Sequence, residues 1–149
     1  GGPAGSLLAY LLAERHGRSV CIIDPAASRP WPNNYGVWLE EWEGLEEKLQ
    51  LGLRECLEVE WEYTDCYFGG SWGIPDEERF RMQRGYGRVD RAKLRERLRT
   101  SSVRVIEDAL DAEVVATNVF TNGSLLHDAD GSTLTLASGR RVRARTVVD

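Results

Sequence analysis

The chain has 149 residues, 42% of them hydrophobic, which is enough for one domain with a core of its own. The formal net charge of -5, from 24 acidic and 19 basic residues, argues against a nucleic-acid binder, because such proteins rely on a clustered basic surface. The sequence has no apolar run near the ~20 residues that span a bilayer. Its three cysteines have no close spacing and therefore predict neither a disulfide framework nor a metal site.

Both ends of the chain have the features of fragment boundaries. The first residue is Gly1, the only methionine is Met82, and residues 145–149 resemble an unfinished strand. The charges are also uneven, with acidic residues concentrated in 40–65 and arginines in 79–104. Such runs are typical of solvated helix faces, and contact with anionic lipid headgroups or a pyrophosphate is the alternative. We expect residues 1–149 to be part of a larger protein.

The first predicted elements are a helix, a strand and a loop. The spacing of four leucines predicts a helix from Ala4 to His16, which Gly17 would end. Residues 19–24 form a short apolar run that ends in an acid, as in a buried parallel strand. Residues 25–32 contain three prolines and are expected to form a loop.

The middle of the chain predicts two helices and two strands. Leucines repeat every four residues from Glu43 to about Leu57, which favours a helix, and apolar residues alternate from 59 to 67, which favours a strand with one buried face. A loop is expected for 69–83. Asp90 can cap a helix at 91–99, and 103–106 is a further short strand.

The last third of the chain has the pattern of an antiparallel meander. Three turn dipeptides, each ending in glycine at positions 123, 131 and 139, separate β-rich runs. These runs are 113–120, 124–127, 132–137 and 141–148. The overall pattern predicts an α/β fold: a Rossmann-like domain followed by an antiparallel β-meander.

The glycine-rich start, Gly1, Gly2, Pro3, Ala4 and Gly5, has the pattern of the end of a dinucleotide-binding G-x-G-x-x-G motif whose first strand and first glycine lie upstream. A side chain at Gly2 would block a pyrophosphate from the helix N-terminus, and one at Gly5 would push the helix from the sheet. Asp24 follows about 20 residues later and suits the ribose hydroxyls. The alternative is that these glycines are ordinary turn residues. The motif indicates a dinucleotide without choosing between FAD and NAD.

The order of the later elements resembles the FAD domain of the flavoprotein hydroxylase and geranylgeranyl reductase superfamily. The helix with Arg91, Leu94 and Leu98 matches its Arg-x-x-Leu-x-x-x-Leu pattern. That resemblance favours FAD and implies that Arg91 lies near the cofactor. A surface arginine paired with Glu96 or Asp90 is the equal alternative.

The segment 31–38, Trp-Pro-Asn-Asn-Tyr-Gly-Val-Trp, is the most unusual stretch of the chain. Aromatic and amide side chains together suit a cavity lining, since rings give apolar area and polar groups fix orientation. The alternative is a surface loop in which two tryptophans fill the core. The candidates for a substrate cavity are Trp31, Asn33, Asn34, Tyr35 and Trp38.

With Tyr-Gly-Arg-Val at 86–89 and Arg91, this segment resembles the lycopene cyclase family of plants, algae and cyanobacteria. The Trp-Pro before the asparagines is typical of the β-type. The stretch 62–83, with Trp72 to Pro75, is longer than that family usually has. The resemblance implies that 1–149 is a partial FAD-binding domain and that the catalytic residues lie beyond 149. Glu41 is the one candidate carboxylate here, although surface carboxylates are commoner.

The resemblance implies an isomerase that closes lycopene to β-carotene without net redox change. Its cofactor would be reduced FAD, with NADPH as a possible reductant, and its substrate an apolar carotenoid. The full protein would lie on a membrane surface: in a plastid (chloroplast) if eukaryotic, or at a thylakoid or cytoplasmic membrane if cyanobacterial. No metal is expected.

Three alternatives stay open at this point. One is an FAD-dependent oxidoreductase, either a monooxygenase or a prenyl reductase. Another is a cyclase paralogue that acts on epoxy-xanthophylls, of the capsanthin-capsorubin or neoxanthin synthase type. The third is an FAD-binding module without catalysis.

Overall fold

The computed structural model describes residues 1–67, 79–111 and 125–148. The chain divides into two compact units, which are described separately. Unit 1 comprises Gly1–Pro30 and Leu98–Asp149, and unit 2 comprises Trp31–Arg97. The strand expected at 113–120, the turn at 122–123, the 72–75 segment and the chain end at 149 lie outside the described residues.

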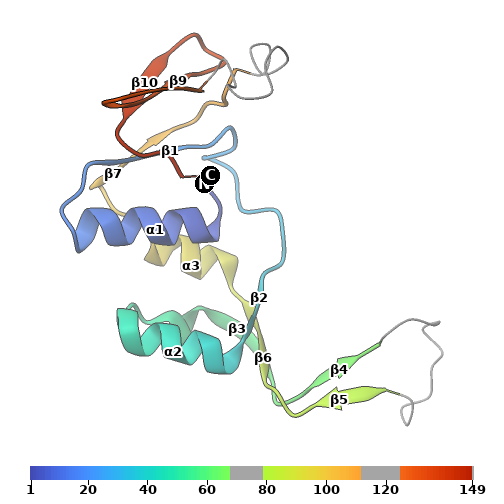
Figure 1. The fold of residues 1–149 in the computed structure, drawn as a ribbon. Helices are drawn as coiled ribbons and strands as arrows, with labels where there is room; N and C mark the ends of the chain where they lie inside the picture. The colour runs from blue at the N-terminus through green and yellow to red at the C-terminus, as the bar shows by residue number, and fades with distance from the viewer. Residues whose placement is uncertain (68–78, 112–124, 149) are drawn as a thin grey trace. The chain divides into compact units, whose positions relative to one another are not determined.

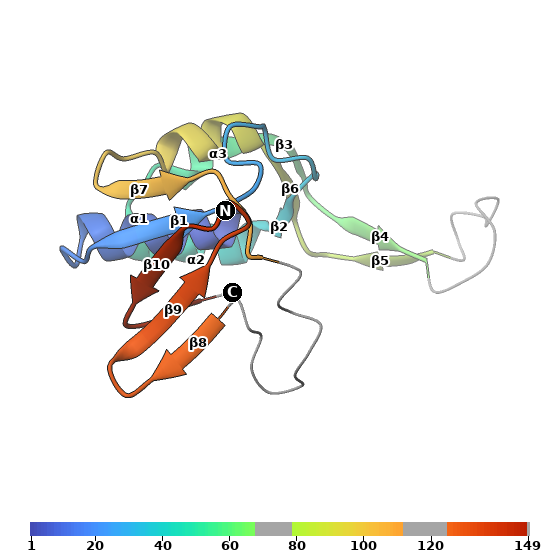
Figure 2. The same cartoon turned by 90° about the horizontal axis from the view of Figure 1, so that it is seen from above.

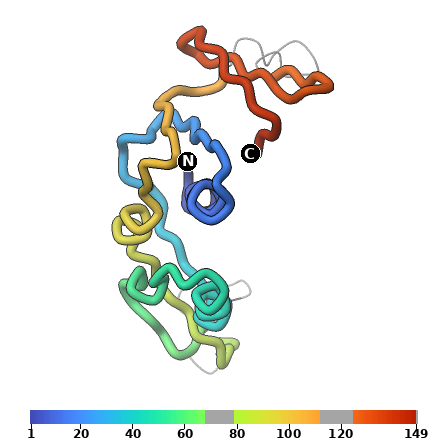
Figure 3. The backbone as a smooth tube through the Cα atoms, turned by 90° about the vertical axis from the view of Figure 1, so that its left-hand side faces the viewer, coloured from blue at the N-terminus to red at the C-terminus, as the bar shows by residue number. Residues whose placement is uncertain are grey.

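Unit 1 contains a helix packed on a pair of parallel strands. α1 (Pro3–Glu14) begins at a proline, whose fixed φ and missing N–H suit the first helical position. β1 (Val20–Ile23) pairs in parallel with β7 (Val103–Ile106), and α1 contacts both strands (Figure 3, where α1 is seen end-on). The predicted helix and the two predicted strands are therefore confirmed: α1 begins one residue earlier and ends two residues earlier than expected, β1 is one residue shorter at each end, and β7 has the expected bounds.

The burial within these elements differs from the expectation. In α1 the buried side chains are Ala9 and Ala13, whereas Leu8 is 39% exposed. Cys21 of β1 is also exposed, so the strand is half-buried rather than buried. A stripe of leucines shows which face of a helix is apolar, but the small alanines are the residues buried here.

The second sheet of unit 1 is the expected meander. β8 (Leu125–Asp128), β9 (Gly131–Thr135) and β10 (Arg141–Ala144) form antiparallel pairs in the order β10-β9-β8 (Figure 2). Gly131 and Gly139 have φ values of 148° and 81°, which an L-residue rarely adopts, so both turns need glycine. Ile106, Leu134 and Leu136 form one buried cluster among the described residues of this unit.

Within its described residues, unit 2 has two helices, a 3₁₀ turn and two small sheets, which Figure 1 labels. β2 (Gly36–Trp38), β6 (Tyr86–Val89) and β3 (Leu57–Trp61) form an antiparallel sheet in the order β2-β6-β3. β4 (Thr64–Cys66) pairs with β5 (Phe80–Met82) as a two-stranded ribbon. The helices are α2 (Leu39–Leu49) and α3 (Arg91–Arg97), and η1 (Leu53–Cys56) is the 3₁₀ turn.

The helix predicted for residues 43–57 is wrong at both ends. α2 starts at Leu39 and stops at Leu49, because Gln50 and then Gly52 adopt left-handed backbone conformations, with φ of 50° and 69°. The backbone N–H groups of residues 51–53, which follow the helix, donate hydrogen bonds to the Glu46 carboxylate. These bonds to a side chain take the place of bonds to helical carbonyls, so the helix ends here. The leucine repeat therefore crosses a helix end, a 3₁₀ turn and the start of β3.

Two other expectations for unit 2 need correction. Trp61, Tyr63 and Tyr67 were expected on a buried strand face but are 45%, 44% and 43% exposed. β3 stops at Trp61, and the chain then enters the separate β4–β5 ribbon. Residues 80–82 form a strand, although the sequence suggested a loop there.

The predicted cap of α3 is confirmed. The Asp90 carboxylate accepts hydrogen bonds from the N–H groups of Ala92 and Lys93, and Leu94 and Leu98 are both buried. The described residues thus form a mixed α/β fold with a parallel strand pair and an antiparallel meander. A Rossmann-like FAD domain stays a prediction.

Candidate functional site

The glycine-rich start and Asp24 are adjacent in unit 1. A Cβ added at Gly1 would lie 1.8 Å from Asp24 Oδ2, so only glycine fits beside this carboxylate. Asp24 follows β1, where its N–H donates to Ile106 and its Oδ1 accepts from the N–H of Ala26. The two parts of the predicted dinucleotide motif therefore meet at one place in the fold.

The N-terminus of α1 has the electrostatic character of an anion site. Its first turn carries no acidic residue, and no side chain caps it, within the part of the chain that the structure describes. A Cβ at Gly2 would have no atom within 4 Å, so the approach to the helix N-terminus is open. A Cβ at Gly5 would also meet nothing, so the expected packing against a sheet is not present among the described residues.

The aromatic-asparagine segment occupies unit 2, and its residues differ in exposure. Trp31 is buried at 7% exposure and lies edge-on to Tyr35, with ring centroids 6.1 Å apart. Asn33 and Asn34 are exposed. Trp38 is half-buried at the end of β2. The segment therefore combines a buried anchor with exposed amide groups.

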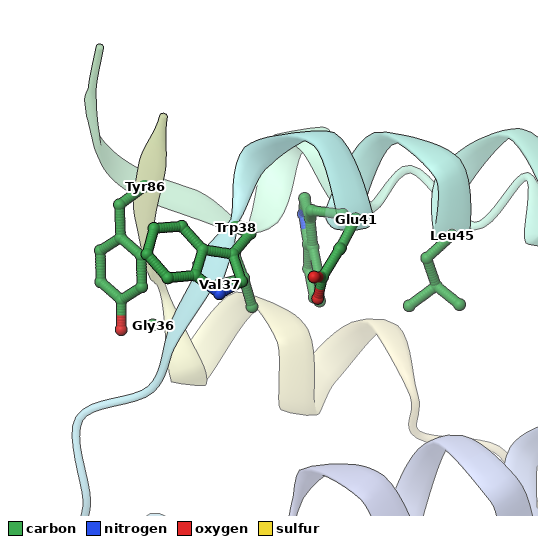
Figure 4. Close-up of a pocket in the computed structure, with 7 residues that line it drawn as sticks. Gly36, Val37, Trp38, Glu41, Leu45 and Tyr86 are labelled. Carbon is green, nitrogen blue, oxygen red and sulfur yellow. The ribbon is translucent and has the colours of Figure 1, made fainter. Parts of the chain in front are cut away.

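Trp38 lines an open pocket of about 470 Å³ in unit 2. Figure 4 shows the rings of Trp38 and Tyr86 beside one another, with Glu41 and Leu45 following along α2. The lining residues are Gly36, Val37, Trp38, Glu41, Trp42, Leu45 and Tyr86. The pocket brings together Trp38, one of the five predicted cavity residues, and Glu41, the candidate carboxylate. Its lining does not include the other four cavity candidates, Trp31, Asn33, Asn34 and Tyr35.

Close packing fixes the aromatic wall of this pocket. Tyr86 lies edge-on to Trp38 with centroids 5.1 Å apart, and Trp61 stacks on Tyr86 at 6.4 Å. A Cβ at Gly36 would lie 1.9 Å from the Tyr86 hydroxyl oxygen, so the tyrosine can lie here only because residue 36 is glycine. Sequence reasoning did not single out Tyr86 as a cavity residue, although it lies in the Tyr-Gly-Arg-Val motif.

Arg84 connects this wall to two carboxylates. Its Nε donates to Glu40 and its Nη2 to Glu41, both at 2.6 Å, and its guanidinium lies over the Trp38 ring. Desolvation lowers the pKa of Arg84, but the hydrogen bonds to Glu41 and Glu40 outweigh it and raise the pKa above its usual value. Arg84 was not predicted from the sequence, where the one available signal was a cation two residues before Tyr86.

Arg91 contacts the aromatic-asparagine segment. Its Nη1 donates to the backbone carbonyls of Pro32 at 2.8 Å and Asn33 at 3.1 Å. This contact was not among the two alternatives suggested by the sequence, a cofactor contact and a pair with Glu96 or Asp90.

Other kinds of site are not evident in the described residues. Their histidines, cysteines and acids form no group of three or more that could hold a metal ion. None of the helices in the described ranges is long and apolar enough to cross a membrane.

Comparisons with known proteins point to one family. The model of a family described as lycopene cyclase protein matches residues 1–149. Neoxanthin synthase of Solanum tuberosum is 34% identical over 99% of this chain, capsanthin/capsorubin synthase of Capsicum annuum 32% over 99%, and lycopene beta cyclase of Arabidopsis thaliana 32% over 100%. In each case the match covers 26% of the relative, so the chain spans about a quarter of the length of these proteins.

A solved structure has a similar fold. The peptidyl tryptophan dihydroxylase QhpG matches 97% of this chain and 29% of its own, with a TM-score of 0.55 and 20% identity. At this identity the match shows the fold alone.

Proposed function

Because the chain belongs to the lycopene cyclase family, we propose that its parent protein is a lycopene β-cyclase. It is an isomerase that closes linear lycopene to β-carotene without net redox change. The observation that carries this proposal is the aromatic pocket of unit 2, where the rings of Trp38 and Tyr86 meet at a fixed angle.

An aromatic pocket suits the chemistry of ring closure. Protonation of a terminal C=C bond gives a carbocation, which attacks a second C=C bond and then loses a proton. The π-electron density of Trp38 and Tyr86 can stabilise such a cation where water is excluded. The apolar side chains of Val37 and Leu45 suit the hydrocarbon end of the substrate.

We propose that Glu41 provides a negative charge on the pocket wall and is not the acid that protonates the substrate. Its Oε1 accepts a hydrogen bond from the Arg84 guanidinium, so this oxygen is engaged as an acceptor and does not offer a proton to the pocket. A negative charge on the pocket wall would stabilise a nearby cation. The acid that protonates the substrate is therefore expected outside residues 1–149.

The residues at the start of the chain fit an FAD molecule. The open space at Gly2 and the first turn of α1, which holds no acid, suit the pyrophosphate; Gly1, Pro3, Ala4 and Gly5 complete this turn. Asp24 Oδ2 suits a ribose hydroxyl. Bound FAD, reduced by NADPH, would supply an electron-rich group or an acid–base group to the reaction. The place of Arg91 near the cofactor stays a prediction; its guanidinium contacts the carbonyls of Pro32 and Asn33.

The protein works in a plastid, because the plant relatives carry the words chloroplastic or chromoplastic in their names. Lycopene is wholly apolar and dissolves in membranes, so we propose that the complete protein docks on a membrane surface to collect it. Its partners are the carotenoid and this surface, with no nucleic acid.

A cyclase paralogue that acts on epoxy-xanthophylls is the second candidate. Neoxanthin synthase and capsanthin/capsorubin synthase are as similar to this chain as lycopene beta cyclase is, at 34%, 32% and 32% identity. The same pocket would serve it, since the rearrangement of a protonated epoxide also passes through a carbocation. The two candidates differ only in the substrate end group.

The test is expression of the full-length parent gene in bacteria that accumulate lycopene, followed by chromatography of the pigments. β-Carotene is the expected product. The purified protein is then supplied with lycopene and with an epoxy-xanthophyll in separate reactions. Conversion of the epoxide alone would replace the first candidate by the second, and NADPH consumption in step with product would indicate an oxidoreductase instead.

A further inference from the structure

The two parallel strands of unit 1 each end at an acidic residue. Ile23 of β1 pairs with Ile106 of β7 at the end of the register (the two strands run side by side in Figure 2). Asp24 and Glu107 are the next residues of the two strands. The N–H of Asp24 donates to the Ile106 carbonyl at 3.1 Å, which extends the pairing by one step. Because ligands of open α/β sheets bind outside the carboxyl ends of the strands, both acids lie at the edge expected for the cofactor.

One carboxylate oxygen of Asp24 is engaged within the turn that follows it. Its Oδ1 accepts a hydrogen bond from the N–H of Ala26 at 2.8 Å, and its carbonyl accepts one from the N–H of Ala27 at 3.3 Å. Its Oδ2 lies toward Gly1, where an added Cβ would be 1.8 Å away. The direction of Oδ2, the oxygen that we assign to the ribose, therefore depends on where the N–H of Ala26 is held.

Glu107 holds the turn that contains Ala26. Its Oε2 accepts a hydrogen bond from the N–H of Ser28 at 3.1 Å, and its Oε1 accepts one from the Ser28 hydroxyl at 2.7 Å. The N–H of Arg29 donates to the Ala26 carbonyl at 2.9 Å, so Ser28 lies within the same turn as Ala26. Ser28 and Glu107 are both exposed, so two hydrogen bonds to a charged group make this contact, and burial does not.

We propose that Glu107 is a positioning residue for the cofactor, because it fixes the turn 25–29 and so directs the Asp24 carboxylate at the ribose hydroxyls. This inference rests on the proposed function for the identity of the cofactor as FAD. Glu107 acts through Ser28 and Ala26 and is not itself a ligand of the nucleotide. Its loss should weaken the ribose contact and leave the N-terminus of α1 available to the pyrophosphate.

The test measures FAD binding to the full-length protein after removal of its flavin. ADP and 2′,3′-dideoxy-ADP, which lacks both ribose hydroxyls, are measured by competition with FAD. The variants are Glu107→Ala, Glu107→Gln, Asp24→Ala and the double variant with alanine at both positions. Asp108→Ala is the matched control, because Asp108 is the next residue and its carboxylate also accepts a serine hydroxyl, that of Ser138 in a turn of the meander.

Asp24→Ala should weaken FAD binding at least about tenfold, since hydrogen bonds to a charged group are lost. Glu107→Ala should weaken it about fivefold and reduce the preference of the wild type for ADP over the dideoxy analogue. The double variant should bind FAD as Asp24→Ala does, because residues that act through one contact are not additive. Glu107→Gln should stay within about twofold of the wild type, since an amide can accept from the Ser28 N–H and donate to its hydroxyl oxygen. Asp108→Ala should match the wild type.

Additive losses of FAD affinity in the double variant would overturn the inference and leave Glu107 with a structural role alone. An unchanged preference for ADP in Glu107→Ala would overturn it as well. Equal losses in Glu107→Gln and Glu107→Ala would do the same, because the charge of Glu107 and not its bonding geometry would then matter. A wild-type protein that binds neither FAD nor ADP would instead refute the proposed cofactor, and this inference with it.

Discussion

The guanidinium of Arg84 lies over the indole ring of Trp38, with its central carbon 4.2 Å from the ring centroid. Trp38 is the ring that we propose as a wall for a carbocation, and it already accommodates a cation in the resting protein. Cation–π attraction depends on ring electron density and is strongest for tryptophan. The contact thus shows that the Trp38 ring takes part in a cation–π contact where Glu40 and Glu41 balance the positive charge.

This relationship predicts the order of activities in a Trp38 series. Trp38→Phe keeps a π face and should lower kcat about threefold, whereas Trp38→Leu keeps only the apolar area and should lower it at least about tenfold. The measurement is β-carotene formation from lycopene by the full-length variants. Tyr63→Leu is the control, because the Tyr63 ring also lies beneath a guanidinium, that of Arg81, but does not line the pocket. Equal activity of the Phe and Leu variants would show that ring electrons play no part.

A second prediction separates cofactor binding from folding. Gly2→Ala adds a methyl group where no atom lies within 4 Å, so the fold should tolerate it, while flavin content should fall several-fold because the methyl group blocks the helix N-terminus. Gly44→Ala, in the middle of α2 and also free of neighbours, is the matched control. It should stabilise the protein by about 0.5–1 kcal/mol, since alanine favours a helix, and leave flavin unchanged. Full flavin content in Gly2→Ala would contradict the assignment.

A third prediction concerns the core of unit 2. Leu53 has no exposed surface, and its carbonyl accepts the hydrogen bond of the buried Trp42 indole N–H. Leu53→Ala should lower the free energy of unfolding by about 2–5 kcal/mol, because it leaves a cavity. Leu49→Ala, at the half-buried end of α2, should cost less. Urea unfolding of both variants measures the two losses of unfolding free energy. A larger loss for Leu49→Ala would show that Leu53 is not at the centre of the core of unit 2.

A fourth prediction is a pH dependence at the end of α2. Hydrogen bonds from the backbone N–H of Leu53, and also from Gly52 and Leu51, hold the pKa of Glu46 below its usual value, although desolvation opposes this. A lowered pKa means that the carboxylate stabilises the fold above its unfolded pKa and loses this contribution as the pH falls through the folded one.

Glu46→Gln should therefore melt lower than the wild type at pH 7, by on the order of 3 °C, and the gap should close below about pH 4. Melting curves from pH 3 to 8 provide the measurement. Glu47→Gln, exposed on the same helix, serves as the control and should show no such gap. A gap that is constant with pH would mean that the charge of Glu46 is not involved.

Much of the fold could be predicted where the signal is local. Asp90 at a helix start predicts a cap, and a glycine at each of two positions predicts a hairpin turn. The structure confirms the cap and both turns. The leucine repeat of 43–57 failed, because periodicity does not show where a backbone leaves the helix. The change occurs at Gln50, which adopts a left-handed conformation with nothing in its residue type to require it.

The site was predictable only in part, for a related reason. The aromatic-asparagine segment is distinctive as a sequence, so its importance could be read directly. Its neighbours come from residues 84–91, and contacts at that separation leave no pattern in one sequence. Tyr86 was therefore missed as a pocket residue, and Arg84 as the partner of Trp38 and Glu41. Arg91 was identified without the two carbonyls that it contacts.

In each of the two sheets of unit 2, an ion pair joins neighbouring strands. Glu58 of β3 pairs with Arg88 of β6, and Asp65 of β4 pairs with Arg81 of β5. Residues 57–67 and 79–89 thus act as complementary halves, although other residues separate them in the chain. In a chimera with a family member that carries other residues at these positions, exchange of one half alone would separate these ion-pair partners. The two halves should be transferred together as one exchangeable module.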